Sequence, residues 1–348
     1  MIAATYTQGI GFAIADVPKP EIQADELLLR VHATAICGTD VKIVRHGSRR
    51  AQDGQRLVLG HEFVGTIAAV GSGVTGYQTG MRIGVAPNFG CGRCEACTRN
   101  MANMCADYSA FGIDMDGSHT GFVRVPAAVI AQGNIVVLPE NVAWDQAALA
   151  EPLSCVLNGQ NAVALKAGDS VAVYGAGPMG LLHVALGAAR GANPIVVVDT
   201  NAERLGKAKE VGATVTVDSS RESVPERVKE ATGGRGLDIV FTAVSVAQIV
   251  PEALQLLAPF GRLCLFAGLL KGKSEVTLDA NLIHYRNLVV TGTSGGCNAD
   301  YRAAMDLIVS GRVDVRPIIS HVLPMSKLGD AYELALAGKG LKIVMRGE

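Results

Sequence analysis

The stretch that decides the fold is Ser-Val-Ala-Val-Tyr-Gly-Ala-Gly-Pro-Met-Gly, residues 170–180. An apolar run of strand length leads directly into the pattern G-x-G-x-x-G, which opens a helical pattern. Gly175 allows a tight turn, Gly177 lets a pyrophosphate approach the backbone, and Gly180 lets helix and strand pack closely. Free N–H groups at the start of the helix attract phosphate. The stretch therefore predicts a dinucleotide-binding strand–turn–helix unit.

An acidic residue follows at the distance that this kind of site requires. Asp199 ends the next apolar run, nineteen residues after Gly180. A carboxylate there accepts hydrogen bonds from ribose hydroxyls and repels a 2′-phosphate, so we expect NAD rather than NADP. Arg204 either stacks on the adenine or is an ordinary solvated helix residue. The expected cofactor-binding residues are Gly175, Ala176, Gly177, Pro178, Met179, Gly180, Asp199 and Arg204.

Strand-sized apolar runs alternate with helical patterns from residue 170 to residue 292. This order is typical of a doubly wound parallel sheet of the Rossmann type. The N-terminal part instead contains short strand patterns separated by Gly, Pro and Asn, which indicate a β-rich domain. We expect two strands near the C-terminus to rejoin it. The predicted α/β protein has a discontinuous β-rich domain, 1–150 and 291–348, and a dinucleotide-binding domain, 151–290.

Composition excludes several classes of protein. The chain has 348 residues, of which 49% are hydrophobic and 18% charged, and this describes two packed domains rather than a disordered chain. A net charge of −1 offers no basic field for nucleic acid. We see no signal-peptide pattern, and the apolar runs are too short to span a membrane. We therefore expect a cytoplasmic protein that binds neither nucleic acid nor membranes.

Four of the eight cysteines fall within fifteen residues, with the spacing C-x₂-C-x₂-C-x₇-C. In a cytosolic protein such a cluster is typical of metal binding rather than of disulfides. Four thiolates close a tetrahedral zinc site with no open position, so we expect a structural zinc; an iron–sulfur cluster and reactive thiols are the alternatives. The segment has little apolar content, and the metal would supply its order. The expected ligands are Cys91, Cys94, Cys97 and Cys105.

A second group of potential ligands is dispersed. His61 and Glu62 stand side by side between glycines in Leu-Gly-His-Glu-Phe-Val-Gly, residues 59–65, and Cys37 lies twenty-four residues before His61. Thiolate, imidazole and carboxylate are the ligand types that zinc prefers. Taken alone, His61 and Glu62 are more typical of a histidine at a strand edge and a solvated carboxylate than of metal ligands.

Together these motifs resemble the zinc-dependent medium-chain dehydrogenase/reductase family along essentially the whole chain. The resemblance rests on Cys37-Gly38-Thr39-Asp40, on Gly60-His61-Glu62 with Gly65, on the four-cysteine segment, and on the glycine-rich loop with Asp199. It implies a GroES-like catalytic domain built from both chain ends, a central Rossmann domain, and a catalytic zinc between the domains. Two zinc ions per chain are therefore expected.

The segment Ala-Glu-Pro-Leu, residues 150–153, resembles the polyol (sorbitol or L-iditol) dehydrogenase and threonine dehydrogenase branches. That resemblance implies a zinc held by Cys37, His61 and Glu62, with Glu151 bound directly or through water. It implies an enzyme that reversibly oxidises a secondary alcohol of a polyol with NAD. The alternatives are a sugar-alcohol phosphate, as in galactitol-1-phosphate dehydrogenases, and L-threonine. A non-catalytic dinucleotide-binding protein is a remote alternative, because the ligand set is intact.

The resemblance also assigns a proton relay, in which Thr39 accepts the alcohol proton. Family members often carry a histidine five residues after the first zinc cysteine, but this chain has Lys42, which either ends the relay or is a solvated loop residue. Basic residues at 45–56 either hold an anionic substrate or form a charged surface. The family associates through an edge strand, near residues 288–292 here, and this implies a homotetramer or a homodimer.

Overall fold

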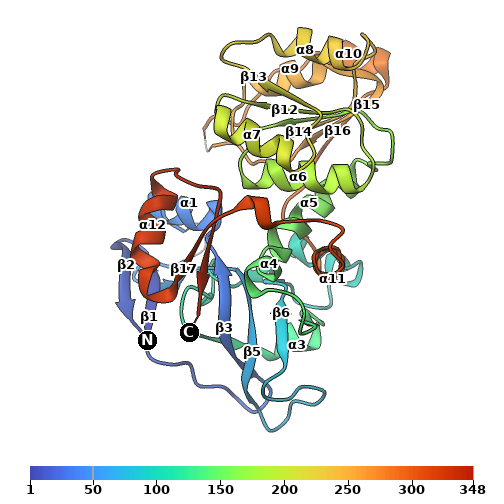
Figure 1. Cartoon of the computed structure of the whole chain (residues 1–348). Helices are drawn as coiled ribbons and strands as arrows, with labels where there is room; N and C mark the ends of the chain where they lie inside the picture. The colour runs from blue at the N-terminus through green and yellow to red at the C-terminus, as the bar shows by residue number, and fades with distance from the viewer. Residues whose placement is uncertain (49–50, 271, 348) are drawn as a thin grey trace. The chain divides into compact units, whose positions relative to one another are not determined.

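The computed structural model describes residues 1–48, 51–270 and 272–347 (Figure 1). It divides into two compact units. The first contains Met1–Ser154, Gly296–Gly311 and Ile319–Glu348, and the second contains Cys155–Gly295 and Arg312–Ile318. The first is the GroES-like unit and the second the Rossmann unit. Within the described residues, no helix is long and apolar enough to cross a membrane.

The Rossmann unit is built on a six-stranded parallel sheet in the order β13-β12-β11-β14-β15-β16. Its strands are β11 (Val171–Tyr174), β12 (Ile195–Asp199), β13 (Val215–Asp218), β14 (Leu237–Thr242), β15 (Leu257–Leu265) and β16 (Val289–Gly292). Its helices are α6 (Pro178–Ala189), α7 (Ala202–Glu210), α8 (Val224–Ala231), α9 (Ile249–Gln255) and α10 (Ala280–Arg286). The order reverses between β11 and β14, and dinucleotides bind at such a switch point.

The central strands of this sheet are apolar because helices cover both of their faces. All four residues of β11 are buried, as are the first four of β12. The sequence predicts a strand starting at Gly261, but β15 starts at Leu257. Its pairing with β14 shifts register between Leu237 and Ile239, and this irregularity hides the first residues of the strand from a pattern search.

The GroES-like unit contains a seven-stranded sheet, a three-stranded sheet in the order β2-β1-β4, and a two-stranded sheet, β7-β8. The path of the largest sheet is β10-β6-β5-β3-β18-β17, with β9 paired to β3. The strands are β1 (Ile2–Thr7), β2 (Gly11–Asp16), β3 (Leu27–Ala35), β4 (Arg56–Val58), β5 (Glu62–Val70), β6 (Arg82–Val85), β7 (Asn88–Phe89), β8 (Ser109–Ala110), β9 (Phe122–Val125), β10 (Ile135–Val137), β17 (Ile319–Pro324) and β18 (Lys342–Arg346).

Short helices connect these strands. They are α1 (Gly38–His46), α2 (Glu95–Thr98), α3 (Ala127–Ala131), α4 (Trp144–Ala147), α11 (Asn298–Val309) and α12 (Leu328–Leu336), while α5 (Ala150–Ala162) runs across the boundary between the units. The short 3₁₀ helices are η1 (Ala102–Met104), η2 (Arg316–Ile318) and η3 (Met325–Lys327).

Both chain ends contribute to the GroES-like unit. The C-terminal strand β18 pairs antiparallel with β3, and α12 contacts α1 and β1. Figure 1 shows these C-terminal elements, in red, among the blue N-terminal ones. Leu29, Phe63, Ile83 and Tyr332 lie fully buried in the shared core, and burial of each such side chain stabilises the fold by about 1.5–3 kcal/mol. The discontinuous domain expected from the sequence is thus held together by its core.

Candidate active site

Three of the expected zinc ligands meet in the GroES-like unit. Ligand atoms of Cys37, His61 and Glu62 all lie within 4.8 Å of one another. The sheet explains this meeting, because Ala35 at the end of β3 lies opposite Glu62 at the start of β5. The residues that follow β3 and precede β5 therefore leave the sheet at the same end. His61 and Glu62 are buried and Cys37 is half-buried.

The glycines around His61 have steric reasons. Gly60 has a φ of 95°, and a Cβ there would lie 2.3 Å from the His119 ring. A Cβ on Gly65 would lie 1.9 Å from the carbonyl oxygen of Arg30 on the neighbouring strand. A side chain at Gly60 or Gly65 would thus displace the turn or the strand that carries His61 and Glu62.

Asp40 lies behind the cluster and organises it, although its sequence pattern predicts no role in the site. Its carboxylate accepts hydrogen bonds from the backbone N–H groups of Cys37 at 2.8 Å and Gly60 at 3.2 Å. One of its oxygens lies 3.6 Å from Nδ1 of His61. Metal-binding histidines direct their second nitrogen at such a carboxylate. An acid three residues after Cys37, in a capping-box position, was the available signal.

The electrostatics of the buried cluster favour a cation. Burial raises the pKa of Asp40, but the charge of His61 and the hydrogen bond from the Cys37 backbone N–H help to outweigh it and lower the pKa to about 2. Burial lowers the pKa of His61, but the Cys37 thiolate and Asp40 raise it well above its ordinary value. These are the properties of a donor set that a metal ion satisfies.

Lys342 is a second partner that the sequence did not reveal. It lies on β18, 280 residues from Glu62 along the chain, and its ammonium group donates to both carboxylate oxygens of Glu62. Both side chains are buried. Burial lowers the pKa of Lys342, but Glu62 and Cys37 raise it above its ordinary value. Direct zinc binding by Glu62 stays a prediction, and it would require the carboxylate to share or exchange its contact with Lys342.

Glu151 is buried in the first turn of α5. Burial raises the pKa of Tyr301 and the charge of Glu151 adds to it, while Glu62, Cys37 and then Glu151 raise the pKa of Lys342 against the effect of burial. The carboxylate stands outside the three-residue ligand group among the described residues, so its binding to zinc stays a prediction. With Cys37 as thiolate, the cluster holds four negative groups (Cys37, Asp40, Glu62 and Glu151) and two positive ones, Lys342 and protonated His61. A divalent zinc ion neutralises this costly buried excess of negative charge.

The two residues of the expected proton relay lie on α1. The backbone N–H of Thr39 donates to Cys37 Sγ at 3.4 Å, so Thr39 lies next to the ligand group and is half-buried. Lys42 is exposed. The role of each in proton transfer stays a prediction.

The cysteine lobe, residues 91–105, gathers four sulfur atoms within 4.8 Å of one another. Cys94 Sγ lies 3.6 Å from Cys105 Sγ, near the roughly 3.8 Å that tetrahedral Zn–S bonds of about 2.3 Å impose. Backbone N–H groups of Arg93 and Cys94 lower the pKa of Cys91 to about 6. A Cβ on Gly90 would lie 2.4 Å from Cys97 Sγ. The spacing fits one metal ion better than an iron–sulfur cluster, which holds its thiolates further apart.

The glycine-rich loop of the Rossmann unit has the expected geometry. Gly175 has a φ of 99°, and a Cβ on Gly180 would lie 1.8 Å from the Gly175 carbonyl oxygen. Nothing lies within 4 Å of the corresponding position at Gly177, so the backbone there is open to a ligand. Asp199 accepts from Ala176 N at 2.6 Å, from Thr200 N at 2.8 Å and from Asn201 N at 2.9 Å. The acid is therefore fixed beside the loop.

Known sequence families match both units. The alcohol dehydrogenase GroES-like domain matches residues 23–139, and the zinc-binding dehydrogenase domain matches residues 178–310. The chain belongs to the zinc-dependent medium-chain dehydrogenase/reductase family. It is accordingly a zinc-containing dehydrogenase of the alcohol type that uses a nicotinamide dinucleotide.

Individual members of the family resemble the chain over nearly its full length. The L-threonine 3-dehydrogenase of Pyrococcus furiosus is 34% identical over 99% of this chain and 98% of its own. The sorbitol dehydrogenase of Bacillus subtilis is 30% identical over 95% of this chain and 93% of its own. A zinc-binding dehydrogenase of Sinorhizobium meliloti 1021, solved with NADP, is 30% identical with a TM-score of 0.91 over 99% of this chain and 98% of its own.

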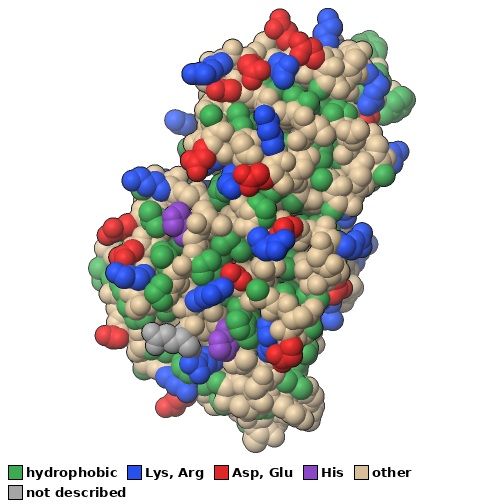
Figure 2. Space-filling view, viewed as in Figure 1, with side chains coloured by type: hydrophobic (Ala, Val, Ile, Leu, Met, Phe, Trp, Pro, Cys, Tyr) green, Lys and Arg blue, Asp and Glu red, His purple; other side chains and the backbone are tan. Residues whose placement is uncertain are grey.

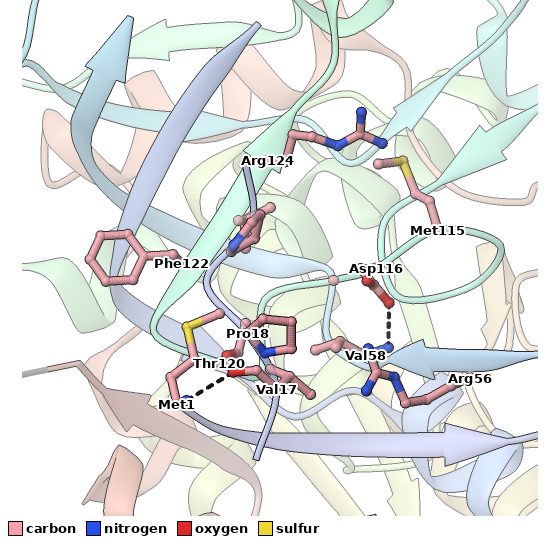
Figure 3. A pocket seen from close by; sticks show the side chains of 13 residues that line it. Met1, Val17, Pro18, Arg56, Val58, Met115, Asp116, Thr120, Phe122 and Arg124 are labelled. Carbon is pink, nitrogen blue, oxygen red and sulfur yellow. Dashed lines mark hydrogen bonds between the residues drawn. The ribbon is translucent and has the colours of Figure 1, made fainter. Parts of the chain in front are cut away.

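The basic segment at 45–56 of this dehydrogenase is only partly described. Arg45 donates to the Leu336 carbonyl oxygen at 2.5 Å, and His46 is exposed. Arg49 and Arg50 lie outside the described residues. Arg56, at the start of β4, lines a pocket together with Phe122 and Arg124 of β9 (Figure 3). No expected zinc or cofactor ligand lines that pocket.

The face shown in Figure 2 intersperses Lys and Arg with Asp and Glu. Charges of both signs recur over the whole visible surface, without a field of one sign. This distribution fits the net charge of −1.

Proposed function

We propose that this dehydrogenase reversibly oxidises a secondary alcohol of a polyol to the ketone, with NAD as the hydride acceptor. The observation that carries the proposal is the buried group of Cys37, His61 and Glu62 in a chain that also holds the glycine-rich loop with Asp199. A zinc ion supplies the Lewis acidity that lowers the pKa of an alcohol hydroxyl, and NAD supplies the hydride acceptor.

The chain's own residues then hold and orient these groups. Cys37 and His61 would hold the metal, and Asp40 fixes the imidazole of His61. Lys342 is paired with Glu62, which can become a further ligand by sharing or exchanging this contact. The Thr39 hydroxyl takes the alcohol proton and passes it on, with Lys42 or water as the next acceptor.

The charge pattern around the cluster supports a polyol over an amino acid. Lys342 is paired with Glu62, and Asp40 with His61. A polyol needs hydrogen-bond donors and acceptors, whereas a zwitterionic amino acid also needs a cation for its carboxylate, and Lys342 is already paired with Glu62. L-threonine is the second candidate, because the similar threonine dehydrogenase has a higher sequence identity than the sorbitol dehydrogenase.

A sugar-alcohol phosphate would require positive groups that converge on the phosphate. The basic segment at 45–56 is the candidate for that role. Arg45 is engaged with a backbone carbonyl on α12, and this contact favours an unphosphorylated substrate.

Asp199 supports NAD over NADP. Its carboxylate is held beside the loop by three backbone N–H groups, and its negative charge there opposes a 2′-phosphate. The Asp199→Ala variant should therefore shift the NAD to NADP ratio of kcat/KM at least tenfold toward NADP. An unchanged ratio would show that other residues select the cofactor. Asp218→Ala, at the end of the neighbouring strand β13, is the matched control.

The substrate test uses the zinc-loaded protein with sorbitol, L-iditol, galactitol 1-phosphate and L-threonine, each with NAD. The highest kcat/KM on an unphosphorylated polyol supports the proposal. A preference for L-threonine establishes the second candidate, and a preference for the phosphate ester overturns the interpretation of the basic segment. Failure to turn over any of these alcohols, with two zinc ions bound per chain, overturns the proposed activity.

The proposal includes a cytoplasmic homotetramer or homodimer. The cysteine lobe gathers four thiols without a disulfide among them, and such thiols are typical of a reducing compartment. β16 is an edge strand of its sheet, and Val289 on it is 50% exposed. An uncovered edge of this kind offers backbone groups to a second chain. Light scattering of the purified protein tests this part, and a monomer would contradict it.

A further inference from the structure

His119 lies on a segment that runs beside the turn leading to His61. The backbone N–H groups of Gly117, Ser118 and His119 donate to the carbonyl oxygens of Val58, Gly60 and Leu59, at 2.7, 2.9 and 2.8 Å. The three acceptors are the residues that directly precede His61. The segment therefore fixes the path of the chain into one expected zinc ligand.

The side chain of His119 reaches the other ligand-bearing segment. Its Nε2 lies 3.3 Å from the carbonyl oxygen of Ala35, two residues before Cys37, and its Nδ1 lies 2.7 Å from the Tyr332 hydroxyl. The ring also packs against Gly60, where any Cβ would collide with it. One imidazole thus contacts the chain just before Cys37 and just before His61.

These contacts specify the protonation of the ring. A carbonyl oxygen can only accept, so Nε2 carries the hydrogen and donates to Ala35, and Nδ1 accepts from the Tyr332 hydroxyl. Burial is the main cause that lowers the pKa of His119, with a smaller contribution from the charge of His61. A neutral imidazole with one donor and one acceptor has both requirements met here, so the ring is held in one orientation.

We infer that His119, supported by Tyr332, is a positioning residue that holds the segments of Cys37 and His61 at the separation that the metal requires. The inference rests on the proposed function, because it assigns His119 a role toward the proposed catalytic zinc. A neighbouring contact also links the His119 segment to the strand that leads to Cys37, since the Ser118 hydroxyl lies 2.7 Å from the Thr34 hydroxyl on β3. Loss of partners behind metal ligands typically costs 10–100-fold in metal affinity.

The test measures zinc release from the purified holoenzyme to a chromogenic chelator. The kinetic phase that Cys37→Ser removes is assigned to the cluster, and the remaining phase to the cysteine lobe. His119→Phe keeps an aromatic ring but loses both hydrogen bonds, and it should accelerate the cluster phase roughly 10–100-fold. The lobe phase should not change.

Three further variants separate positioning from packing. His119→Gln, whose amide can still donate to Ala35, should restore slow release at least in part. Tyr332→Phe removes only the hydroxyl and should accelerate the cluster phase less than His119→Phe. His183→Phe makes the same chemical change in the Rossmann unit and should leave both phases as in the wild type.

Several results would overturn the inference. These are an unchanged cluster phase in His119→Phe, a His119→Gln variant as fast as His119→Phe, or equal acceleration by His183→Phe. If His119→Phe does not fold, Tyr332→Phe decides, and wild-type release in that variant overturns the inference. A wild-type protein without a phase that Cys37→Ser removes would instead refute the proposed function at its metal, and the inference with it.

Discussion

The cysteine lobe and the cluster around Cys37 collect their ligands in opposite ways. The lobe takes four thiolates from fifteen consecutive residues. Three of the four cysteines are only half-buried. The cluster takes its ligands from two separate segments and its supporting groups from as far away as Lys342, and most of these are buried. A local site needs little beyond its spacing, whereas a dispersed site needs a fold to assemble it. The lobe is therefore suited to a structural metal ion. The cluster is suited to a metal ion whose ligands are modulated by the surrounding fold.

The largest expected effect comes from removing one ligand from each metal site in turn. Cys37→Ser should abolish turnover and reduce bound zinc from two ions per chain to one, while NAD binding is retained. Cys94→Ser should remove the other zinc and unfold the lobe, because that segment has little core of its own. Metal analysis, turnover and NAD titration of the two variants check this. Loss of NAD affinity in Cys37→Ser would contradict the role given to Cys37.

The difference between the sites explains what the sequence could predict. All four cysteines of the lobe were expected from the sequence, since they stand at recognisable spacings. In the cluster, Cys37, His61 and Glu62 were found from motifs, but Lys342 was not, because no local pattern links residues 62 and 342. The sheet supplies that link through the pairing of β3 with both β5 and β18.

Two other supporting residues were missed for different reasons. Asp40 stands within a quoted motif, but a capping acid is so common at helix starts that the pattern did not mark it as a partner of His61. His119 stands in a segment without a recognisable motif. The Rossmann sheet, in contrast, was largely predictable, because its central strands β11 and β12 are contiguous apolar runs.

The next effect concerns the buried ion pair. Lys342→Met should destabilise the folded protein by about 3–5 kcal/mol, because it leaves the Glu62 carboxylate buried without its partner. Lys327→Met is the matched control, since Lys327 forms an exposed ion pair with Asp330, and it should change stability by less than about 1 kcal/mol. Denaturant unfolding of the zinc-free proteins measures both. Equal effects would mean that Lys342 contributes no more than a surface pair.

The smallest effect uses a buried histidine that has no acid beside it. His183 packs between Phe241 and Phe266, and neither ring nitrogen has a hydrogen-bond partner among the described residues. Burial lowers its pKa to about 3. In His61, by contrast, the neighbouring negative groups overcome burial. Comparison of the two histidines therefore separates the effect of burial on the pKa from the effect of neighbouring negative groups.

This contrast predicts the pH dependence of stability. A folded-state pKa below the unfolded value of about 6.5 means that the unfolded state binds the proton more readily. The stability that neutral His183 contributes is thus fully present above pH 6.5 and is lost as pH falls toward the folded pKa of about 3. At pH 5 the loss amounts to about 2 kcal/mol. His183→Phe has no such loss, so its free energy of unfolding relative to that of the wild type should rise by that amount between pH 7 and pH 5. Urea unfolding at the two pH values measures it, and a pH-independent difference would show that the imidazole reaches water or a partner in the folded protein.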